Sequence, residues 1–143
     1  MMKPQEVIDA FDFLDDWDER FELVTELGRG LAPMPEGDKT DANQVPGCTT
    51  RTWLSGHLRP AEPPVIEYLA DAEGPLVRGL VALLLAPFQG RTPAEVLALD
   101  PNPFIGRLGL EDALSVQRRA GMYAFIDRVK LIARAHIHPA SDQ

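Results

Sequence analysis

Apolar residues recur at steps of three and four in the N-terminal part of the chain, a spacing typical of amphipathic helices. One such segment covers residues 4–13, and a second begins at Trp17 and continues to about Gly30. Asp16 stands directly before the second segment and Glu19 follows three residues later, which is the arrangement of a capping box. The pattern therefore predicts a short leading helix and a longer helix that starts after Asp16.

The middle of the chain changes to a pattern typical of strands. Residues 51–58 and 65–70 are rich in β-branched and aromatic side chains, and a proline-rich connection, residues 59–64, separates them. An antiparallel pair is the simplest arrangement of two strands joined in this way. The preceding stretch, residues 32–47, is polar and broken by proline and glycine, so we expect an exposed loop there.

Helical spacing returns after the strands. Pro75 favours a helix start, and the broad apolar face that follows predicts the most buried helix. Residues 92–95 read Thr-Pro-Ala-Glu, which predicts a capped, short helix that residues 100–103 end. A long terminal helix is predicted from about Ser115, with a frayed tail over residues 136–143.

Length and composition fit one soluble domain. The chain has 143 residues, of which 45% are hydrophobic and 25% charged. Thirteen prolines and eleven glycines are more than a long helical bundle tolerates, so a mixed fold is favoured. We predict an α+β fold in which a small antiparallel sheet packs against several helices, in a single domain over residues 1–143 with its core at about 11–135.

Charge and hydropathy exclude two classes of partner. Acidic residues outnumber basic ones by 22 to 14, the net charge is −8, and the arginines are scattered, so no nucleic acid is expected. No stretch approaches the ~20 apolar residues of a membrane helix. The longest, residues 80–86, stops at Pro87. The N-terminus meets acids before any apolar run, unlike a secretory signal, so we expect a cytoplasmic protein without membrane contact.

The only cysteine, Cys48, follows a turn formed by Val45, Pro46 and Gly47. A single cysteine can form neither an internal disulfide nor a metal site made mainly of cysteines. Across proteins, a lone cysteine is more often an inert core residue than a nucleophile, and the turn position leaves both interpretations open. If the thiol is reactive, Arg51 is a candidate to stabilise its thiolate.

The histidines do not indicate a metal site. His136 and His138 are two residues apart, a spacing that does not point both rings to one side of a helix. His57 lies in a predicted strand, where a structural role is favoured. We therefore expect no metal and no cofactor.

Five pieces of sequence occur in the order and spacing of a known family. They are a tryptophan-led helix ending in leucine-glycine, a glycine-cysteine pair before a tryptophan, an acidic turn before a valine-basic-glycine-leucine helix, a leucine-glycine-leucine segment, and a leucine-serine pair with an arginine before alanine-glycine. In this chain the first piece is Trp17–Phe21 with Glu26–Gly28, and the second is Asn43, Val45 and Gly47–Cys48 with Trp53. The third is Asp71 and Glu73 with Val77–Leu80, the fourth is Leu108–Leu110, and the fifth is Leu114–Ser115 with Arg118 and Ala120–Gly121. The chain thus resembles the SufE family, also called the Fe–S metabolism associated or CsdE-like family, over residues 11–135.

The resemblance implies a fold shared with IscU-type scaffolds and a role as a sulfur acceptor. Cys48 would take persulfide sulfur from a pyridoxal-phosphate cysteine desulfurase, SufS- or CsdA-like, and pass it to a Suf scaffold complex for iron–sulfur cluster assembly. Such a protein is a carrier and desulfurase activator, a monomer or weak homodimer, and not itself an enzyme. The resemblance also implies that Arg118 is a second candidate to support the thiolate.

The active loop implied in this way comprises Val45, Pro46, Gly47, Thr49 and Thr50 around the cysteine. The family usually has glutamine-serine-x-valine after its cysteine, whereas this chain has threonine, threonine, arginine and threonine. We expect the departure to affect the rate and the choice of partner. A persulfide is easily reduced or oxidised, so we also expect the thiol to be shielded at rest and to swing out on docking.

Two alternatives remain open at the level of sequence. The first is a single-cysteine redox protein, a peroxide sensor or reductase, although a second, resolving cysteine is missing. The second is a binding adaptor that keeps the fold and does not use Cys48 in sulfur transfer.

Overall fold

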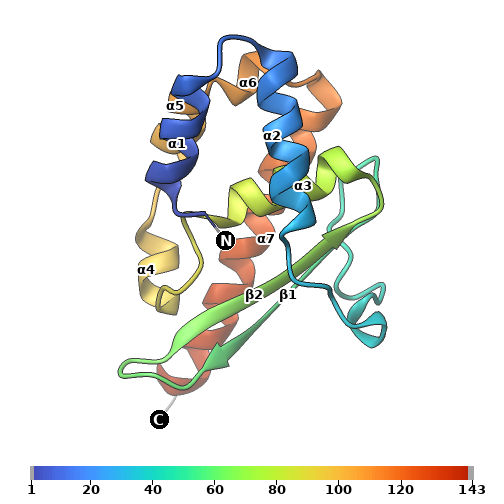
Figure 1. Cartoon of the computed structure of the whole chain (residues 1–143). Helices are drawn as coiled ribbons and strands as arrows, with labels where there is room; N and C mark the ends of the chain where they lie inside the picture. The colour runs from blue at the N-terminus through green and yellow to red at the C-terminus, as the bar shows by residue number, and fades with distance from the viewer. Residues whose placement is uncertain (1, 142–143) are drawn as a thin grey trace.

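An antiparallel hairpin of β1 (Thr52–Arg59) and β2 (Val65–Ala72) lies among the helices (Figure 1). The computed structural model describes residues 2–141, with side chains up to residue 137. The helices are α1 (Pro4–Phe13), α2 (Trp17–Arg29), the 3-10 helix η1 (Glu36–Asp38), α3 (Pro75–Leu85), α4 (Pro93–Ala98), α5 (Asn102–Leu108), α6 (Leu110–Ala113) and α7 (Val116–Ser141). The predicted α+β class with an antiparallel pair of strands is confirmed.

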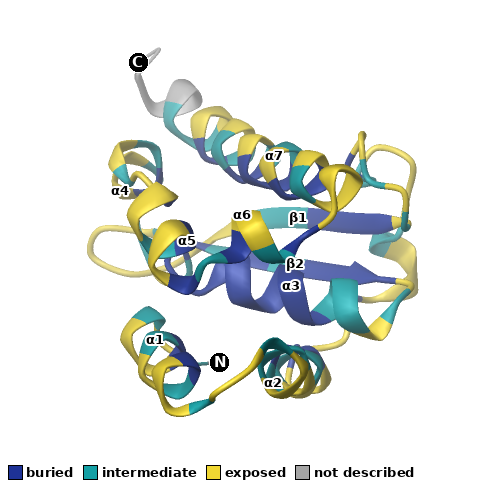
Figure 2. Cartoon of the chain, turned by 90° about the horizontal axis from the view of Figure 1, so that it is seen from above, coloured by how far each residue is buried: buried dark blue, intermediate teal, exposed yellow. Residues whose placement is uncertain are grey.

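The elements stack in layers, which are clearest from above (Figure 2). Helix α7 packs along β1, α3 packs along β2, and α2 packs across α3 on the side away from the hairpin. Every residue from Gly79 to Leu85 is buried, as the broad apolar face predicted. One hydrophobic cluster runs through these layers and includes residues of α1, α2, both strands, α3 and α7. The core therefore lies around α3 and the hairpin.

Local chemistry explains where the predicted helices begin. The Asp16 carboxylate accepts a hydrogen bond from the Glu19 amide at 2.9 Å, which satisfies a free donor at the start of α2. Thr92 and Glu95 form a complete capping box at α4, and Pro75 occupies the first turn of α3. These starts agree with the sequence analysis.

Two glycines allow α2 and α3 to cross at very short range. A Cβ added to Gly79 would lie 2.0 Å from the Val24 carbonyl oxygen, and one added to Gly28 would lie 2.7 Å from the Gly79 amide nitrogen. No larger residue fits at Gly79 unless the two backbones separate. The crossing holds α2 beside the start of α3.

The hairpin register brings its open end next to Cys48. Thr52 pairs with Ala72 at this end, and Arg59 pairs with Val65 at the other. Near the middle, the buried Tyr68 hydroxyl donates to the Val129 carbonyl of α7 at 2.8 Å, and burial raises the pKa of this phenol. The hairpin is thereby fixed to α7.

The structure corrects the sequence analysis at two places. Residues 100–103 were expected only to end the preceding helix, and no helix was expected before about Ser115. The structure has α5 and α6 there, because Pro103 suits a first helical turn and Gly109, at φ +70°, separates the two helices. The stretch 32–47 is not wholly exposed. Met34 and Val45 are buried in it, and the Val45 amide donates to the Thr52 carbonyl at 2.8 Å.

The C-terminal helix extends further than expected. α7 continues through His136 to Ser141, into the tail predicted to be frayed, and residues 142 and 143 lie outside the described residues. Ala133 is fully buried, which fastens this part of the helix to the body. Among residues 2–141, no helix combines the length and apolar character needed to cross a bilayer.

Candidate functional site

Cys48 lies on the loop that connects the η1 region to β1, and the loop packs on the first turns of α7. Gly47 has φ +84°, a left-handed conformation that glycine adopts without strain. The position of its missing Cβ is 3.4 Å from the Ala124 Cβ of α7. Gly47 therefore permits both the turn and the close approach that set the sulfur against α7.

The Cys48 thiol contacts the backbone of α7 directly. Its S–H donates to the Gly121 carbonyl, with a distance of 3.7 Å between sulfur and oxygen. A Cβ at Gly121 would stand 3.5 Å from the sulfur. The glycine thus leaves the carbonyl open to the thiol and keeps the sulfur in van der Waals contact with the helix.

An apolar cavity of about 50 Å³ opens beside the sulfur. It lies between α3, α6 and α7, and its apolar lining includes Val77, Leu80, Leu110, Met122 and Phe125. A space of roughly 10–15 Å³ on this measure already holds a water molecule, so one additional sulfur atom fits. The half-buried thiol therefore has a sheltered space next to it, consistent with the shielded resting position expected from the sequence.

The environment keeps the resting thiol neutral. Burial raises the pKa of Cys48 above that of a free cysteine, and the neighbouring Thr52 side chain offsets this only in part. A buried thiol beside a carbonyl oxygen is a poor nucleophile, because the thiolate is the reactive form. In this conformation Cys48 is protected, and reaction requires a change in its surroundings.

The two candidate arginines occupy different places. Arg118 is exposed and lines the mouth of the cavity that Cys48 shares. Arg51 points elsewhere: its guanidinium lies 5.1 Å from the centre of the Trp53 ring, and its Nη1 is 3.9 Å from a carboxylate oxygen of Glu73. In the resting state Arg118 lines the same cavity as the thiol, whereas Trp53 and Glu73 hold Arg51 on the neighbouring surface.

The remaining loop residues divide into an anchored and a free part. Thr49 and Thr50 line the cavity with the cysteine, and Pro46 is exposed. Val45 is buried and bonded to the strand, so it belongs to the anchor. Arg51 is anchored as well, because its carbonyl accepts a hydrogen bond from the Glu73 amide at 3.0 Å. The segment that can move without breaking these contacts is short, residues 46–50.

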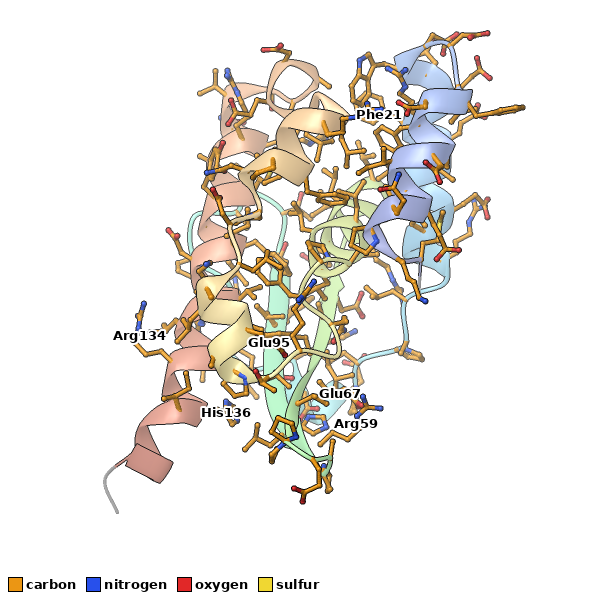
Figure 3. All side chains as sticks on the ribbon, turned by 90° about the vertical axis from the view of Figure 1, so that its left-hand side faces the viewer. Phe21, Arg59, Glu67, Glu95, Arg134 and His136 are labelled. Carbon is orange, nitrogen blue, oxygen red and sulfur yellow. The ribbon has the colours of Figure 1, made fainter. Side chains whose placement is uncertain are left out.

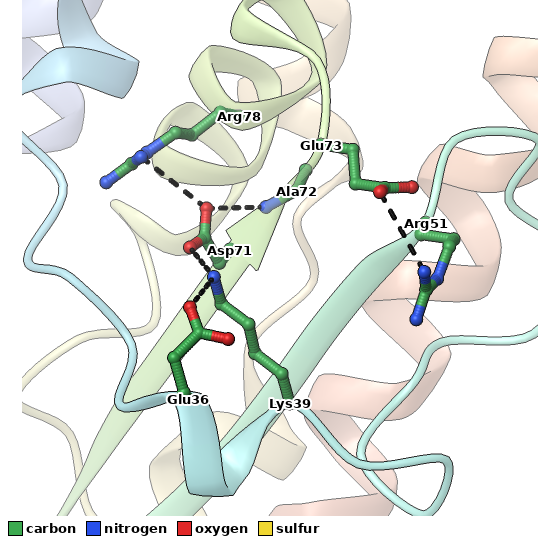
Figure 4. A network of polar contacts seen from close by, with 7 residues as sticks. All are labelled: Glu36, Lys39, Arg51, Asp71, Ala72, Glu73 and Arg78. Carbon is green, nitrogen blue, oxygen red and sulfur yellow. Dashed lines mark hydrogen bonds and ion pairs between the residues drawn. The ribbon is translucent and has the colours of Figure 1, made fainter.

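A buried carboxylate fastens the incoming arm of the loop (Figure 4). Asp71 lies 3.1 Å from the Lys39 ammonium and 3.6 Å from the Arg78 guanidinium, and it accepts from the Ala72 amide at 2.8 Å. Lys39 also pairs with Glu36 at 3.0 Å, and its hydrogen bonds to Glu36 and Asp71 raise its pKa. These contacts join η1, the end of β2 and α3.

Gly121 and Thr52 were not predicted as site residues. A glycine inside a helical pattern is an available signal, since it costs helix stability and often marks close packing. The contact of Thr52 with the thiol had no sequence signal, because it depends on how the loop folds back over β1.

No cluster of three or more histidine, cysteine, aspartate or glutamate side chains suited to a metal occurs in the described part of the chain. The His57 ring lies 3.5 Å from Glu67, and the His136 ring contacts the Ile132 carbonyl at 2.9 Å. The side chain of His138 lies outside the described residues.

Comparisons with known proteins agree with the geometry. The model of the SufE family, described as the Fe-S metabolism associated domain, matches residues 5–133. A SufE-like protein of Rhizobium meliloti (strain 1021) is 38% identical over 138 residues, covering 96% of this chain and 99% of the relative. The sulfur acceptor protein CsdE of Escherichia coli (strain K12) is 33% identical over 120 residues, 84% of this chain and 80% of CsdE.

A solved structure shows the same fold. The solution structure of a hypothetical protein from Thermus thermophilus superposes with a TM-score of 0.75 at 21% identity, over 96% of this chain and 99% of that one. The family match and the curated relatives both extend over most of the sequence. The chain belongs to the SufE family.

Proposed function

We propose that the protein is a sulfur acceptor of Fe–S metabolism, in which Cys48 takes sulfur from a pyridoxal-phosphate cysteine desulfurase and passes it on for cluster assembly. The observation that carries the proposal is the single thiol, held half-buried beside an apolar cavity that admits one more sulfur atom. The family match and the name of the relative CsdE support the same role.

The transfer is an exchange of sulfur between two thiols. Cys48 loses its proton, and its thiolate attacks the outer sulfur of the persulfide on the desulfurase cysteine. The bond between the outer and inner sulfur of the partner breaks, and the partner cysteine leaves as a thiolate that takes up a proton. A new sulfur–sulfur bond forms on Cys48, so no external oxidant or reductant is consumed.

The resting geometry favours storage over reaction. Burial and the Gly121 carbonyl both favour the neutral thiol, so we infer that docking moves residues 46–50 and exposes the sulfur. Water then lowers the thiol pKa toward its free value of ~8.5 and raises the thiolate fraction. The return movement carries the sulfur back toward the cavity.

Arg118 is the candidate to support the thiolate during the transfer. Arg118 is exposed and lines the same cavity as Cys48, and a guanidinium that approaches the sulfur favours the thiolate. Arg51 can take this role only if its contacts with Trp53 and Glu73 break. We therefore expect Arg118→Ala to slow sulfur acceptance more than Arg51→Ala. Equal rates for the two variants and the wild type would remove both arginines from the mechanism.

An activation assay tests the proposed function. A purified cysteine desulfurase is supplied with L-cysteine, and alanine formation is followed with the wild-type chain, with Cys48→Ser and without either. We expect the wild type alone to accelerate turnover, because it removes the persulfide that blocks the next cycle. If Cys48→Ser accelerates turnover equally, the protein is an adaptor. If neither does and Cys48 instead consumes peroxide, the redox alternative takes its place.

A further inference from the structure

A groove along α2 lies outside the thiol cavity, and the turn between β2 and α3 separates it from the cysteine loop. Its floor is apolar and half-buried, and its rim carries the carboxylates of one helix face. The floor includes Leu14, Phe21 and Leu76, and the rim includes Asp18, Glu19 and Glu22. The residue before Leu14, Phe13, is 87% exposed, which is unusual for so large an apolar side chain.

The carboxylates of the rim have few basic side chains to pair with. Among the residues described, no salt bridge involves Asp18, Glu19 or Glu22, whereas Glu26 at the other end of the groove pairs with Arg29. Repulsion from Asp16, with smaller contributions from burial, Asp15 and Glu22, raises the pKa of Glu19. Residues 3–29 contain nine of the 22 acidic residues and three of the 14 basic ones, a balance of −6 out of −8 for the whole chain. Most of the net negative charge of the chain therefore lies on α1 and α2, the helices of this end of the molecule.

The groove is continuous with the surface around Cys48. Thr25 and Arg29 line the groove and also a second hollow, which is completed by residues 72–75. The Glu73 amide donates to the Arg51 carbonyl at 3.0 Å, and Gly74 lies against Thr50 of the cysteine loop. A protein that covers Cys48 can therefore reach α2 across the short turn between β2 and α3.

From these relationships we propose that the α2 groove docks a basic, amphipathic segment of the sulfur-donating desulfurase, with its lysines or arginines against the carboxylate rim and an apolar side chain on the Leu14–Phe21–Leu76 floor. The inference rests on the proposed function and adds to it a partner contact that does not touch the thiol. Complementary charge increases the association rate and selects partners more than it strengthens binding, and salt screens it.

A charge-neutralising pair of variants isolates the groove. Asp18→Asn with Glu22→Gln removes two rim charges one helical turn apart, and both side chains are exposed. Glu62→Gln with Glu67→Gln makes the same change of charge at the far end of the hairpin. Phe21 and Glu67 lie at opposite ends of the molecule (Figure 3). A second groove variant, Asp18→Lys with Glu22→Lys, reverses the charge at the same positions.

The measurement is desulfurase turnover, followed as alanine formation, against the concentration of each variant at low and high salt. We expect the groove pair to raise the KM for this chain by about threefold or more at low salt, with the maximal rate unchanged, and the lysine pair to raise it further. At roughly 1 M salt, where the Debye length is about 3 Å, these differences should disappear. The hairpin pair should behave as the wild type.

The outcomes separate this inference from the proposed function. If the wild type and all variants accelerate turnover with the same KM, the groove is not a docking site, and the acceptor role stays intact. A groove variant that changes the oligomeric state on size exclusion while its KM stays at the wild-type value would assign the groove to a second copy of this chain and overturn the inference. A wild type that does not accelerate turnover would refute the proposed function itself.

Discussion

The sulfur of Cys48 lies 3.7 Å from the carbonyl oxygen of Gly121, a residue 73 positions later in the chain. This contact joins the cysteine loop to the long C-terminal helix. It also explains why a glycine occupies an interior position of α7, where it weakens the helix. The closed state of the loop depends on the space that this glycine leaves.

Enlarging residue 121 should open the loop. An alanine Cβ would stand 3.5 Å from the sulfur, an ordinary contact, whereas leucine overfills the site at a typical cost of about 1–3 kcal/mol. If that cost is relieved by opening, Gly121→Leu raises the alkylation rate of Cys48 by a bulky maleimide roughly tenfold, since about 1.4 kcal/mol is a factor of ten.

The control for residue 121 is Gly106→Leu in α5, where an added Cβ meets nothing within 4 Å. This variant and Gly121→Ala should alkylate at nearly the wild-type rate. An unchanged rate for Gly121→Leu, with the fold retained by circular dichroism, would show that the contact with α7 does not hold the loop closed.

The reactivity of Cys48 should depend on pH in a way that reports its burial. Because burial raises the thiol pKa, alkylation of the folded chain should rise with pH around a midpoint above the ~8.5 of a free thiol. In urea the midpoint should fall to the free value. A folded midpoint at or below the unfolded one would contradict the buried, neutral thiol.

The same shift makes stability depend on pH. The folded state favours the protonated thiol, so the stabilisation is complete below the unfolded pKa and is lost as the pH rises through the folded pKa. Urea unfolding of the wild type and Cys48→Ser, compared from pH 7 to pH 10, should show the wild type losing stability relative to the variant above about pH 8.5. Parallel curves over this range would contradict the shift.

Removing the charge of Asp71 should loosen the arm that leads to the cysteine. Asp71→Asn keeps the bond to the Ala72 amide but leaves Lys39 and Arg78 without their anion, and we expect a loss of about 2–3 kcal/mol in the free energy of unfolding. Hydrogen exchange should accelerate at residues 36–45. Glu73→Gln, which affects only an exposed pair, should cost less than about 1 kcal/mol. Unchanged exchange at 36–45 would argue against the anchor.

The crossing of α2 and α3 should tolerate no side chain at Gly79. Because an added Cβ would stand 2.0 Å from the Val24 carbonyl oxygen, Gly79→Ala should destabilise the fold by about 3 kcal/mol or more. The matched change Gly37→Ala meets open space and should be nearly neutral. Urea midpoints compare the two, and equal midpoints would show that the helices can separate at little cost.

Helices whose first residues carry a local capping signal could be predicted from the sequence. Asp16 before α2 and Thr92 before α4 act through bonds to amides three residues away, so their roles are local. Helices α5 and α6 were missed because proline and glycine, here Pro103 and Gly109, are also common where a helix ends and a turn follows. Only the fold shows that Pro103 occupies a helix start and that Gly109 joins two helices.

The sequence predicted the cysteine of the site but not the residues that contact its sulfur. The turn and the family resemblance pointed to Cys48, but the partners of the sulfur come from distant segments. Gly121 is 73 positions away, and the direction of Arg51 depends on where Trp53 and Glu73 lie after folding. Contacts of this kind follow from tertiary packing, which no local pattern contains.

The intact mass of the protein after incubation with a cysteine desulfurase and L-cysteine tests the central claim most directly. The account predicts that the wild type gains the mass of one sulfur atom, that a reductant removes it, and that Cys48→Ser gains nothing. A wild type that stays at its original mass beside a desulfurase shown to be active, or a Cys48→Ser variant that gains the same sulfur, would contradict the assignment of Cys48 as the sulfur acceptor.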